Sequence, residues 1–444
     1  MPVDYVYRIE QPHLAGQLAT TCGQIAEAGG LIGDVVTVSL GRHRSIREIS
    51  VEVRDHGQAK RVAGTLERLD GVRVLSFYDR ALQAHVGGKL AVEVIARVES
   101  IQDMRDVYTP GVARVCTAIA EDPTLANRFT MIGRTVAICT NGTRVLGLGN
   151  IGAVASMPVM EGKALFYRQM AGISSMPILI DTEDPDEFVE TVLRIAPGFG
   201  GIHLEDIRAP ECFEIERSLI EALDVPVMHD DVHGTAVVAV AAVLAACAQV
   251  GVEIGDSVVG QVGLGAAGLG IATLMVEGGA MRVIASDPQE ASHERARERG
   301  IEIVSFEQVM AEARVVVATT GVPGLIEPSL VREGQVILAL TNPDPEITPQ
   351  AAEDAGAAFA ADGTSVNNVL GYPGIFRGAL AAGASKISTQ MKLAAARAIA
   401  ALTNESELVP DALDPHVHAQ VADAVAAAAQ DEGLGRPERV PAGL

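Results

Sequence analysis

The first eighty residues alternate between short runs of period two and longer runs of helical period. In "REISVEVRD", Ile49, Val51 and Val53 alternate with polar residues, which is typical of a strand with one buried face. The segments "QLATTCGQIAEAGG" and "AKRVAGTLERLDG" instead place apolar residues on one helical face and end in glycine. With "YVYRIE", "DVVTVSL" and "VRVLSFY" as further strands, the predicted order over residues 1–84 is βαββαβ, a ferredoxin-like sandwich.

From residue 85 onward, apolar runs of strand length alternate with helical stretches. The strands that we expect are "TVAICT", "RVLGLG", "MPILID", "GGIHLED", "VPVMHDD", "SVVGQVGLG", "MRVIASD", "RVVVATT" and "QVILALTN". This alternation predicts α/β architecture with parallel sheets. We expect one domain over residues 85–247, a second over 248–385, and Ala-rich helices over 386–444 that pack back on the core.

The most apolar stretch, "TAVVAVAAVLAACAQVGV" from Thr235, is near the length of a membrane span. It is rich in alanine and follows the charged segment "HDDVHG", so we interpret it as a buried core helix. The start of the chain has neither the basic region nor the apolar region of a signal peptide. We therefore expect no membrane partner.

Composition narrows the class of partner further. The net charge is −23, and a field of this sign repels nucleic acid and anionic membrane surfaces. The five cysteines are far apart and form no C-x-x-C motif, which argues against a disulfide framework and fits a reducing cytoplasm. Small molecules and metal ions are therefore the expected partners.

Two segments share the spacing G-x-G-x-x-G, "GLGNIG" from Gly147 and "GLGAAG" from Gly263. A dinucleotide-binding loop must follow a strand, open a helix, and precede by about 20 residues an acid that binds the ribose. The second segment meets these conditions, because Asp287 ends the next strand 24 residues after Gly263. After the first segment, Pro158 is expected to break the helix, and the next acid at a strand end, Asp181, is 34 residues away. We expect the second loop to bind the dinucleotide, and an acid at its ribose favours NAD over NADP.

Two predicted strands end in pairs of carboxylates, Glu205 with Asp206 and Asp230 with Asp231. The carboxyl ends of parallel strands line the ligand crevice, so the four acids can converge there. Carboxylates this close repel one another unless a cation sits among them. Oxygen ligands without a Cys or His cluster point to Mg²⁺ or Mn²⁺. From spacing alone, helix N-caps or solvated turns are the alternative.

Six motifs along the chain resemble the bacterial form of the malic enzyme family. They are "VYTPGVARVC", "RVLGLGNIGAVASMPVMEGKALFY", "HLEDIRAPECFEIE", "HDDVHGTA", "TNPDPEIT" and "VNNVLGYPGIFRGAL". The similarity is collinear over roughly residues 85 to 425. It implies oxidative decarboxylation of L-malate with reduction of NAD, a substrate domain with a parallel sheet, and a Rossmann NAD-binding domain. The alternatives are preference for NADP, and an inactive ligand-sensing regulatory protein.

The resemblance also implies roles for individual residues. It makes Tyr108 of "YTPG" the proton donor, Lys163 of "MEGK" the general base, and Asp230 the neighbour of that lysine. The implied metal ligands are Glu205, Asp206 and Asp231. The implied substrate contacts are Arg144, Asn342 and Asn368. The expected cofactor contacts are Gly263, Gly265, Ala266, Ala267, Gly268, Asp287, Thr320, Asn342 and Asn368. By the same resemblance, "GLGNIG" is a tight turn near the substrate.

A lysine that serves as general base must first lose its proton. We expect burial and a nearby cation to lower the pKa of Lys163 from about 10.4 towards neutrality. The negative charge of Asp230 is expected to raise the pKa of Lys163 instead. The expected task of Asp230 is therefore to orient Lys163 and to relay its proton.

The N-terminal βαββαβ pattern, with "IAEAGGLIGDV" after its first helix, resembles the ACT domain. ACT domains usually bind an amino acid or another small effector at an interface between copies. The resemblance therefore implies a metabolite effector and a homodimer or higher homo-oligomer. A structural or dimerising appendage without a ligand is the alternative.

Overall fold

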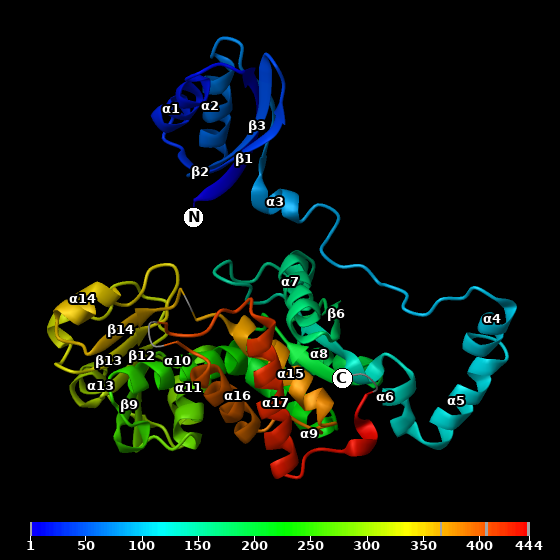
Figure 1. The fold of residues 1–444 in the computed structure, drawn as a ribbon. Coiled ribbons are helices and arrows are strands. Elements are labelled where there is room, and N and C mark those ends of the chain that lie inside the picture. Colours follow the sequence, from blue (N-terminus) through cyan, green and yellow to red (C-terminus); the bar gives the residue numbers. More distant parts are fainter. Residues whose placement is uncertain (1, 365, 405–406, 442–444) are drawn as a thin grey trace. The chain divides into compact units, whose positions relative to one another are not determined.

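A computed structural model of the protein describes residues 2–364, 366–404 and 407–441. The chain forms two compact units, Met1–Lys89 and Leu90–Leu444 (Figure 1). Residues 85–100 contain neither helix nor strand.

The first unit is an antiparallel sheet packed against two helices, α1 (Gln17–Glu27) and α2 (His56–Glu67). Its strand order is β2-β3-β1-β4. The strands are β1 (Val3–Pro12), β2 (Leu31–Leu40), β3 (Arg44–Val53) and β4 (Arg73–Asp79). Alternate residues of β3, namely Ile49, Val51 and Val53, are buried in one core with residues of both helices. The predicted βαββαβ order and the predicted buried face of β3 are confirmed.

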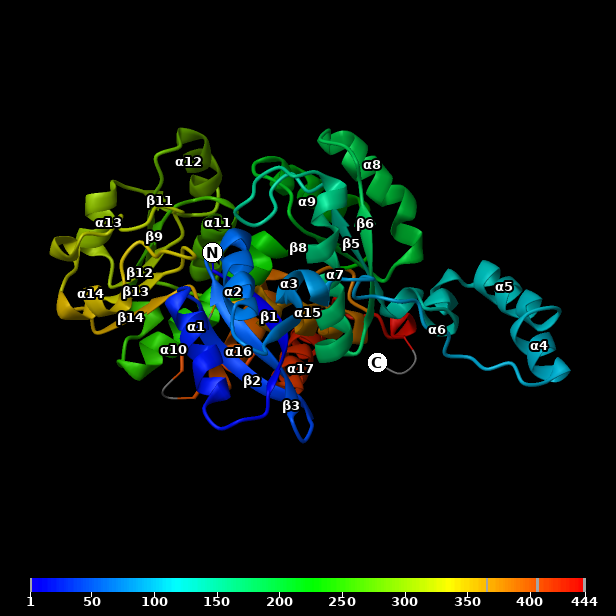
Figure 2. The same cartoon turned by 90° about the horizontal axis from the view of Figure 1, so that it is seen from above.

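The second unit contains two parallel sheets. The four-stranded sheet has the order β6-β5-β7-β8 and the six-stranded sheet the order β11-β10-β9-β12-β13-β14. Figure 2 shows the six-stranded sheet on the left of this unit and the four-stranded sheet on the right. The strands are β5 (Thr135–Thr140), β6 (Ser174–Leu179), β7 (Gly201–Leu204), β8 (Val227–His229), β9 (Val258–Val262), β10 (Arg282–Ser286), β11 (Glu302–Ile303), β12 (Val315–Ala318), β13 (Val336–Ala339) and β14 (Phe359–Asp362). The predicted α/β class with parallel sheets is confirmed.

Two local predictions are wrong. The segment "RVLGLG" is not a strand but a turn, closed by a bridge between Val145 and Gly149. Pro158 does not break the following helix, because α7 (Ala153–Ala171) continues through it. A proline within a helix removes one hydrogen bond, here to the carbonyl of Val154, and the exposed position of that residue gives its carbonyl access to water.

Helix α10 (Thr235–Gln249) forms the centre of the second unit. Almost every residue from Ala236 to Cys247 is buried, so the predicted core helix is confirmed. By length and apolar composition the segment Asp230–Gln249 could cross a membrane, but 72% of its apolar window is buried inside the chain. Three late helices share its hydrophobic core, α15 (Tyr372–Ala381), α16 (Thr389–Ala401) and α17 (Pro415–Asp431).

Candidate active site

Four carboxylates follow two neighbouring strands of the four-stranded sheet. Glu205 and Asp206 come directly after β7, while Asp230 and Asp231 begin the single turn η4 (Asp230–Gly234) after β8. The two strands are parallel and in register, with Leu204 opposite His229, so both pairs of acids lie at one sheet end. Carboxylate oxygens of Glu205, Asp206 and Asp231 lie within 4.8 Å of one another.

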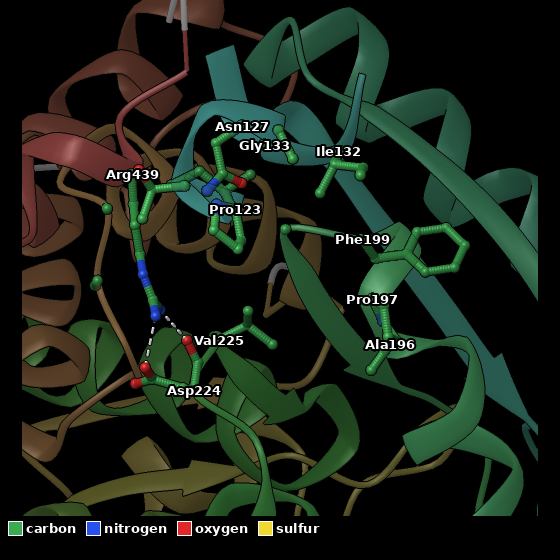
Figure 3. A pocket seen from close by; sticks show the side chains of 16 residues that line it. Pro123, Asn127, Ile132, Gly133, Ala196, Pro197, Phe199, Asp224, Val225 and Arg439 are labelled. Carbon is green, nitrogen blue, oxygen red and sulfur yellow. Dashed lines mark hydrogen bonds and ion pairs between the residues drawn. The ribbon is translucent and has the colours of Figure 1, made fainter. Parts of the chain in front are cut away.

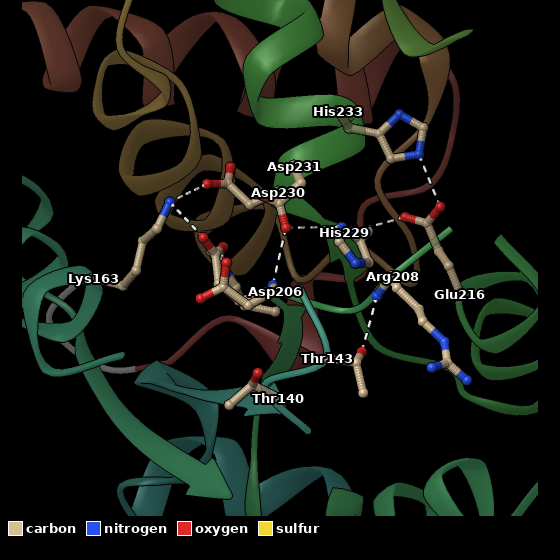
Figure 4. Close-up of polar contacts among 12 residues, drawn as sticks. Thr140, Thr143, Lys163, Asp206, Arg208, Glu216, His229, Asp230, Asp231 and His233 are labelled. Atoms are coloured by element: carbon tan, nitrogen blue, oxygen red, sulfur yellow. Dashed lines mark hydrogen bonds and ion pairs between the residues drawn. The ribbon is translucent and has the colours of Figure 1, made fainter. Parts of the chain in front are cut away.

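Helix α7 brings Lys163 to these acids (Figure 4). Its Nζ donates to Oδ2 of Asp230 at 2.5 Å and lies 3.1 Å from Oε1 of Glu205. The ring of Tyr372 covers the ammonium group, with 4.6 Å between Nζ and the ring centroid. Lys163 is 9% exposed, so this charge is held almost entirely by its ionic and aromatic neighbours.

Burial and mutual repulsion govern the charges of this cluster. Burial raises the pKa of Glu205 and of Asp206 to about 8, and the other carboxylates add to the rise. Burial also raises the pKa of Asp230, to about 6, against the opposing effect of Lys163. For Lys163 itself, burial lowers the pKa, but Asp230 and Glu205 outweigh it and bring the pKa above its usual value. Burial acts in the direction that we expected, and the lowering expected from burial together with a nearby cation stays a prediction.

The cluster suits a divalent cation. Oδ2 of Asp206 and Oδ1 of Asp230 are buried, and neither has a hydrogen-bond partner among the described residues. Buried acceptors of this kind are costly unless a donor or a cation satisfies them. The donors offered by Glu205, Asp206 and Asp231 are all oxygens, the preference of Mg²⁺ and Mn²⁺.

The first glycine segment forms a turn against these acids. The backbone N–H of Arg144 donates to the carbonyl of Asp206 at 3.0 Å. Among the described residues other than glycine, Leu146 and Asp206 are the two with positive φ, at 48° and 55°. Gly142, with φ of 65°, must lack a side chain because a Cβ would lie 2.3 Å from the carbonyl oxygen of Gly152. The side chain of Arg144 is exposed at the mouth of this turn.

The second glycine segment joins β9 to α11 (Ala266–Glu277). Gly263 has φ of 90°, and a Cβ on Gly268 would lie 2.1 Å from the carbonyl oxygen of Gly263. Around Gly265 there is open space, and no side chain caps the helix that follows. The first N–H groups of a helix attract anions, so this loop can hold a pyrophosphate.

The remaining predicted cofactor contacts follow strand ends of the six-stranded sheet. Asp287, after β10, accepts from the N–H of Leu264 and of Gln289, both at 2.7 Å. Thr320, after β12, donates through its N–H and its hydroxyl to Glu346. Asn342, after β13, donates to the carbonyl of Gly363 at 3.0 Å.

Asn368 begins the turn η7 (Asn368–Leu370), which packs against η4 and so approaches the carboxylate cluster. Tyr108, by contrast, lies at the end of α4 (Ile101–Val107) and is 69% exposed. Among the described side-chain interactions, none joins Tyr108 to the cluster around Lys163. A single copy of the chain therefore assembles the predicted base and metal ligands without the predicted proton donor.

Two buried residues of the site were not predicted from the sequence. His203 of β7 contacts Oε2 of Glu205 through Nε2 at 2.7 Å, and its Nδ1 contacts the hydroxyl of Tyr167 at 2.8 Å. The two side chains together fix the carboxylate of Glu205. The sequence feature that could have indicated them is the histidine within the apolar run "GGIHLED". A buried histidine ring needs polar partners.

A separate cavity of about 280 Å³ lies at the amino end of the same sheet (Figure 3). Its lining includes Gly133, Gly200 and Val225, which shortly precede β5, β7 and β8. Arg439 borders it and donates through Nη2 to Oδ2 of Asp224 at 2.6 Å. None of the predicted site residues is among the described residues that line this cavity.

Fold and site together define a class of α/β oxidoreductases that join a dinucleotide-binding sheet to a second sheet, whose carboxyl end carries carboxylates that face a lysine on a helix. Residues 88–220 match the malic enzyme N-terminal domain and residues 359–431 the malic enzyme NAD binding domain. Residues 235–323 match the NAD binding domain of D-isomer specific 2-hydroxyacid dehydrogenases.

Individual relatives agree with these matches. The chain is 51% identical over 423 residues to NAD-dependent malic enzyme 1 of Bacillus subtilis, covering 95% of this chain and 96% of that protein. The crystal structure of malic enzyme from Pyrococcus horikoshii superposes with a TM-score of 0.76 at 37% identity, covering 80% and 91% of the two chains. For NAD-dependent malic enzyme from Thermotoga maritima the TM-score is 0.73 at 36% identity, covering 79% and 99%. This chain belongs to the malic enzyme family.

Proposed function

We propose that the chain converts L-malate and NAD⁺ into pyruvate, CO₂ and NADH. The observation that carries this proposal is the pairing of Lys163 with Asp230 and Glu205, beside a cluster of carboxylates suited to Mg²⁺ or Mn²⁺. The relatives named NAD-dependent malic enzymes, which align over nearly the whole chain, support the same reaction.

We assign to Lys163 the task of taking the proton from the C2 hydroxyl of malate, after its ammonium group has passed its own proton to Asp230. Asp230, 2.5 Å from Nζ, holds the lysine in place and can exchange a proton with it. When bound, NAD⁺ would accept the hydride from C2. A divalent ion held by Glu205, Asp206 and Asp231 would supply Lewis-acid stabilisation of the negative charge that develops on the C2 oxygen. We assign the exposed Arg144 to a carboxylate of malate, and Asn342 and Asn368 to contacts with substrate and nicotinamide.

Tyr108 is the group proposed to protonate C3 after CO₂ leaves. Its exposure, and the exposure of neighbouring Ile101, Met104 and Val107, supports a homodimer in which a second copy covers this segment and receives Tyr108. Mixing the inactive variants Tyr108→Phe and Lys163→Ala under subunit exchange should then restore activity, because one site of each mixed dimer is intact. Mixtures that stay inactive despite exchange would contradict shared sites.

Preference for NAD over NADP is proposed from Asp287. Its carboxylate lies at the end of β10 and is anchored to the glycine loop through the N–H of Leu264. A fixed negative charge at this position accepts the 2′-hydroxyl of NAD and repels a 2′-phosphate. An NADP-preferring enzyme is the alternative.

The first unit is proposed to bind an amino acid or another metabolite and to pair with a second copy. Its edge strand β2 exposes Leu31, Ile32, Val36 and Leu40, and an exposed apolar edge favours pairing with another chain. Stimulation or inhibition of the full chain by an amino acid, with a matching rise in melting temperature, would support an effector. A purely structural appendage would leave both unchanged.

We propose a cytoplasmic location. The five cysteines are all unpaired in the structure, and three of them are buried as thiols, which fits a reducing compartment.

The test of the main proposal is the initial rate of NADH or NADPH formation from L-malate with Mn²⁺, together with assay of pyruvate. A malate- and metal-dependent rate with NAD⁺, absent in Lys163→Ala, is the expected result. Absence of turnover with either cofactor would favour the inactive regulatory protein instead.

A further inference from the structure

The turn η4 determines where two of the four carboxylates point. Asp230 faces Lys163 from this turn, and Asp231 joins the cluster with Glu205 and Asp206. The turn is closely packed, because a Cβ on Gly234 would lie 1.7 Å from Oδ1 of Asp230. Small displacements of η4 would therefore move both acids at once.

One side chain outside the proposed reaction contacts both ends of this turn. Glu216, on α9 (Glu211–Ala222), accepts through Oε1 from the backbone N–H of His229 at 2.7 Å. Through Oε2 it contacts Nε2 of His233 at 2.9 Å (Figure 4). His229 and His233 flank the two acids in the sequence. Neither ring nitrogen of His229 has a hydrogen-bond partner among the described residues, although Nδ1 lies 3.7 Å from Oδ2 of Asp231, so the contact with Glu216 adds to the restraint that β8 gives this residue.

Glu216 is a buried anion with partners on several elements. Burial raises its pKa, but His233 and Lys392 outweigh burial and bring the pKa to about 2. An ionised carboxylate only accepts hydrogen bonds, so Nε2 of His233 carries the proton in this contact. Lys392, buried on α16, adds a positive charge from the C-terminal helices. Three segments distant in the sequence thus meet behind the carboxylate cluster.

We propose that Glu216 is a positioning residue for the divalent ion: by holding both ends of η4 it orients Asp231 towards Glu205 and Asp206. This inference rests on the proposed function, because it assumes that these three carboxylates bind the ion. Oδ2 of Asp231 also accepts from the backbone N–H of Asp206 at 2.9 Å. A displacement of η4 would therefore also disturb the position of Asp206. Residues that orient metal ligands in this way commonly change affinity 10–100-fold when removed, an effect of about the size expected here.

The surroundings of Glu216 make truncation informative. Glu216 and His233 line a cavity of about 510 Å³, together with Val232, Leu269 and Gly270. In Glu216→Ala, water from this cavity can reach the two donors that lose their acceptor, which favours a folded variant. Glu216→Gln keeps an oxygen acceptor for the N–H of His229. Glu221→Ala, five residues further along α9 at an exposed position, is the matched control.

The experiment measures Mn²⁺ binding to the full chain by titration calorimetry and by the electron paramagnetic resonance signal of free Mn²⁺. We expect Glu216→Ala to raise the Kd for Mn²⁺ about 10-fold or more. Glu216→Gln should recover most of the affinity, and Glu221→Ala should match the wild type. In turnover, the KM for Mn²⁺ should rise more in Glu216→Ala than kcat at saturating Mn²⁺ falls.

The outcomes separate this inference from the proposed function. Wild-type Mn²⁺ affinity in folded Glu216→Ala would overturn the inference and leave the metal site standing. Absence of Mn²⁺ binding by the wild type would overturn both. If Glu216→Ala does not fold, His233→Leu removes one of the two contacts, and it should weaken Mn²⁺ binding by a smaller factor. Unchanged affinity in that variant would likewise overturn the inference.

Discussion

Each of the two parallel sheets in the second unit has a strand that is followed by a G-x-G-x-x-G segment. The carboxyl ends of the two sheets nevertheless carry different chemical groups. At the carboxyl end of the four-stranded sheet, the turn from Gly147 lies beside buried carboxylates and Lys163. At the carboxyl end of the six-stranded sheet, the loop from Gly263 presents backbone N–H groups and open space around Gly265. One sheet end presents charged side chains, and the other presents the backbone N–H groups of a helix start.

This difference explains why one spacing supports two roles. In the second loop, β9 runs directly into Gly263, and α11 begins at Ala266 within the motif. In the first, β5 ends at Thr140, and α7 begins at Ala153, after the motif has ended. Only the second arrangement places the start of a helix within the glycine motif, where its N–H groups can face an anion. Each prediction below disturbs one sheet end and leaves the other intact.

Removal of divalent metal should have the largest effect on the charged end. Treatment with a chelator is expected to abolish turnover, since a bound ion contributes several kcal/mol of stabilisation to developing charge. Binding of NAD⁺ should persist, because the predicted NAD⁺ contacts at the six-stranded sheet include no predicted metal ligand. It can be measured by calorimetry or by separating free NAD⁺ from the protein. Full activity after chelation, or a loss of activity that added Mn²⁺ does not reverse, would contradict the charged end as a cation site.

Lys163→Ala should lower kcat by a factor of about 10² to 10⁴, the range for loss of a general base. Its Nζ contacts both Asp230 and Glu205, so the variant also removes the cationic partner of two buried acids, of which Glu205 keeps its contact with His203. The rate of NADH formation checks the first effect, and the Kd for NAD⁺ should remain near that of the wild type. A variant that keeps more than a tenth of the rate would show that another group is the base.

Lys392→Met should change the pH dependence of stability behind the charged end. Burial lowers the pKa of Lys392 from its usual 10.5 to about 8, against the opposing effect of Glu216. The unfolded chain therefore binds more protons than the folded chain between pH 8 and 10.5, so this lysine destabilises the fold at lower pH and less as pH rises. We expect the free energy of unfolding of the wild type to gain about 3 kcal/mol relative to the variant across that range.

Denaturant unfolding at several pH values measures this difference. The exposed Lys386 on the same segment supplies the control, and Lys386→Met should leave the pH profile unchanged. Parallel profiles for the wild type and Lys392→Met would contradict a buried lysine at this position.

Gly268→Ala should damage the backbone end. The added Cβ would lie 2.1 Å from the carbonyl oxygen of Gly263 and 2.7 Å from Oγ1 of Thr319, so the loop must shift. We expect a loss of about 1–3 kcal/mol of stability and a raised KM for NAD⁺. Gly147→Ala is the matched change in the other loop, where nothing lies within 4 Å of the added atom, and it should behave as the wild type. Equal effects of the two variants would remove the distinction between the loops.

Asp287→Asn should have the smallest effect. The amide keeps one oxygen for the N–H of Leu264, but it loses the second acceptor, which receives the N–H of Gln289, and the negative charge. We expect the ratio of kcat/KM for NADP⁺ to that for NAD⁺ to rise about tenfold, as the repulsion of a 2′-phosphate weakens. An unchanged ratio would show that residues other than Asp287 determine the preference for NAD⁺ or NADP⁺.

Much of the fold could be predicted from local patterns. Alternation in "REISVEVRD" and helical spacing in "QLATTCGQIAEAGG" predicted a strand and a helix, since each pattern reflects one buried face of one element. The acid pairs could be expected to meet, because carboxyl ends of adjacent parallel strands share an edge. The family motifs named the same residues for the site. These inferences need only short-range geometry and a general rule of sheet topology.

Other features depended on contacts that no local pattern encodes. Lys163 and Asp230 are 67 residues apart, and their pairing follows from the packing of α7 against strands β5 and β6 of the sheet that also contains β8. The local sequence of α9 does not distinguish Glu216 from other acids on an amphipathic helix. Its contacts with His229 of β8 and His233 of η4 exist only in the folded chain. The sequence by itself determined the elements and the chemical types available. Tertiary structure decided which buried charges face one another, because that choice depends on the summed packing of the whole unit.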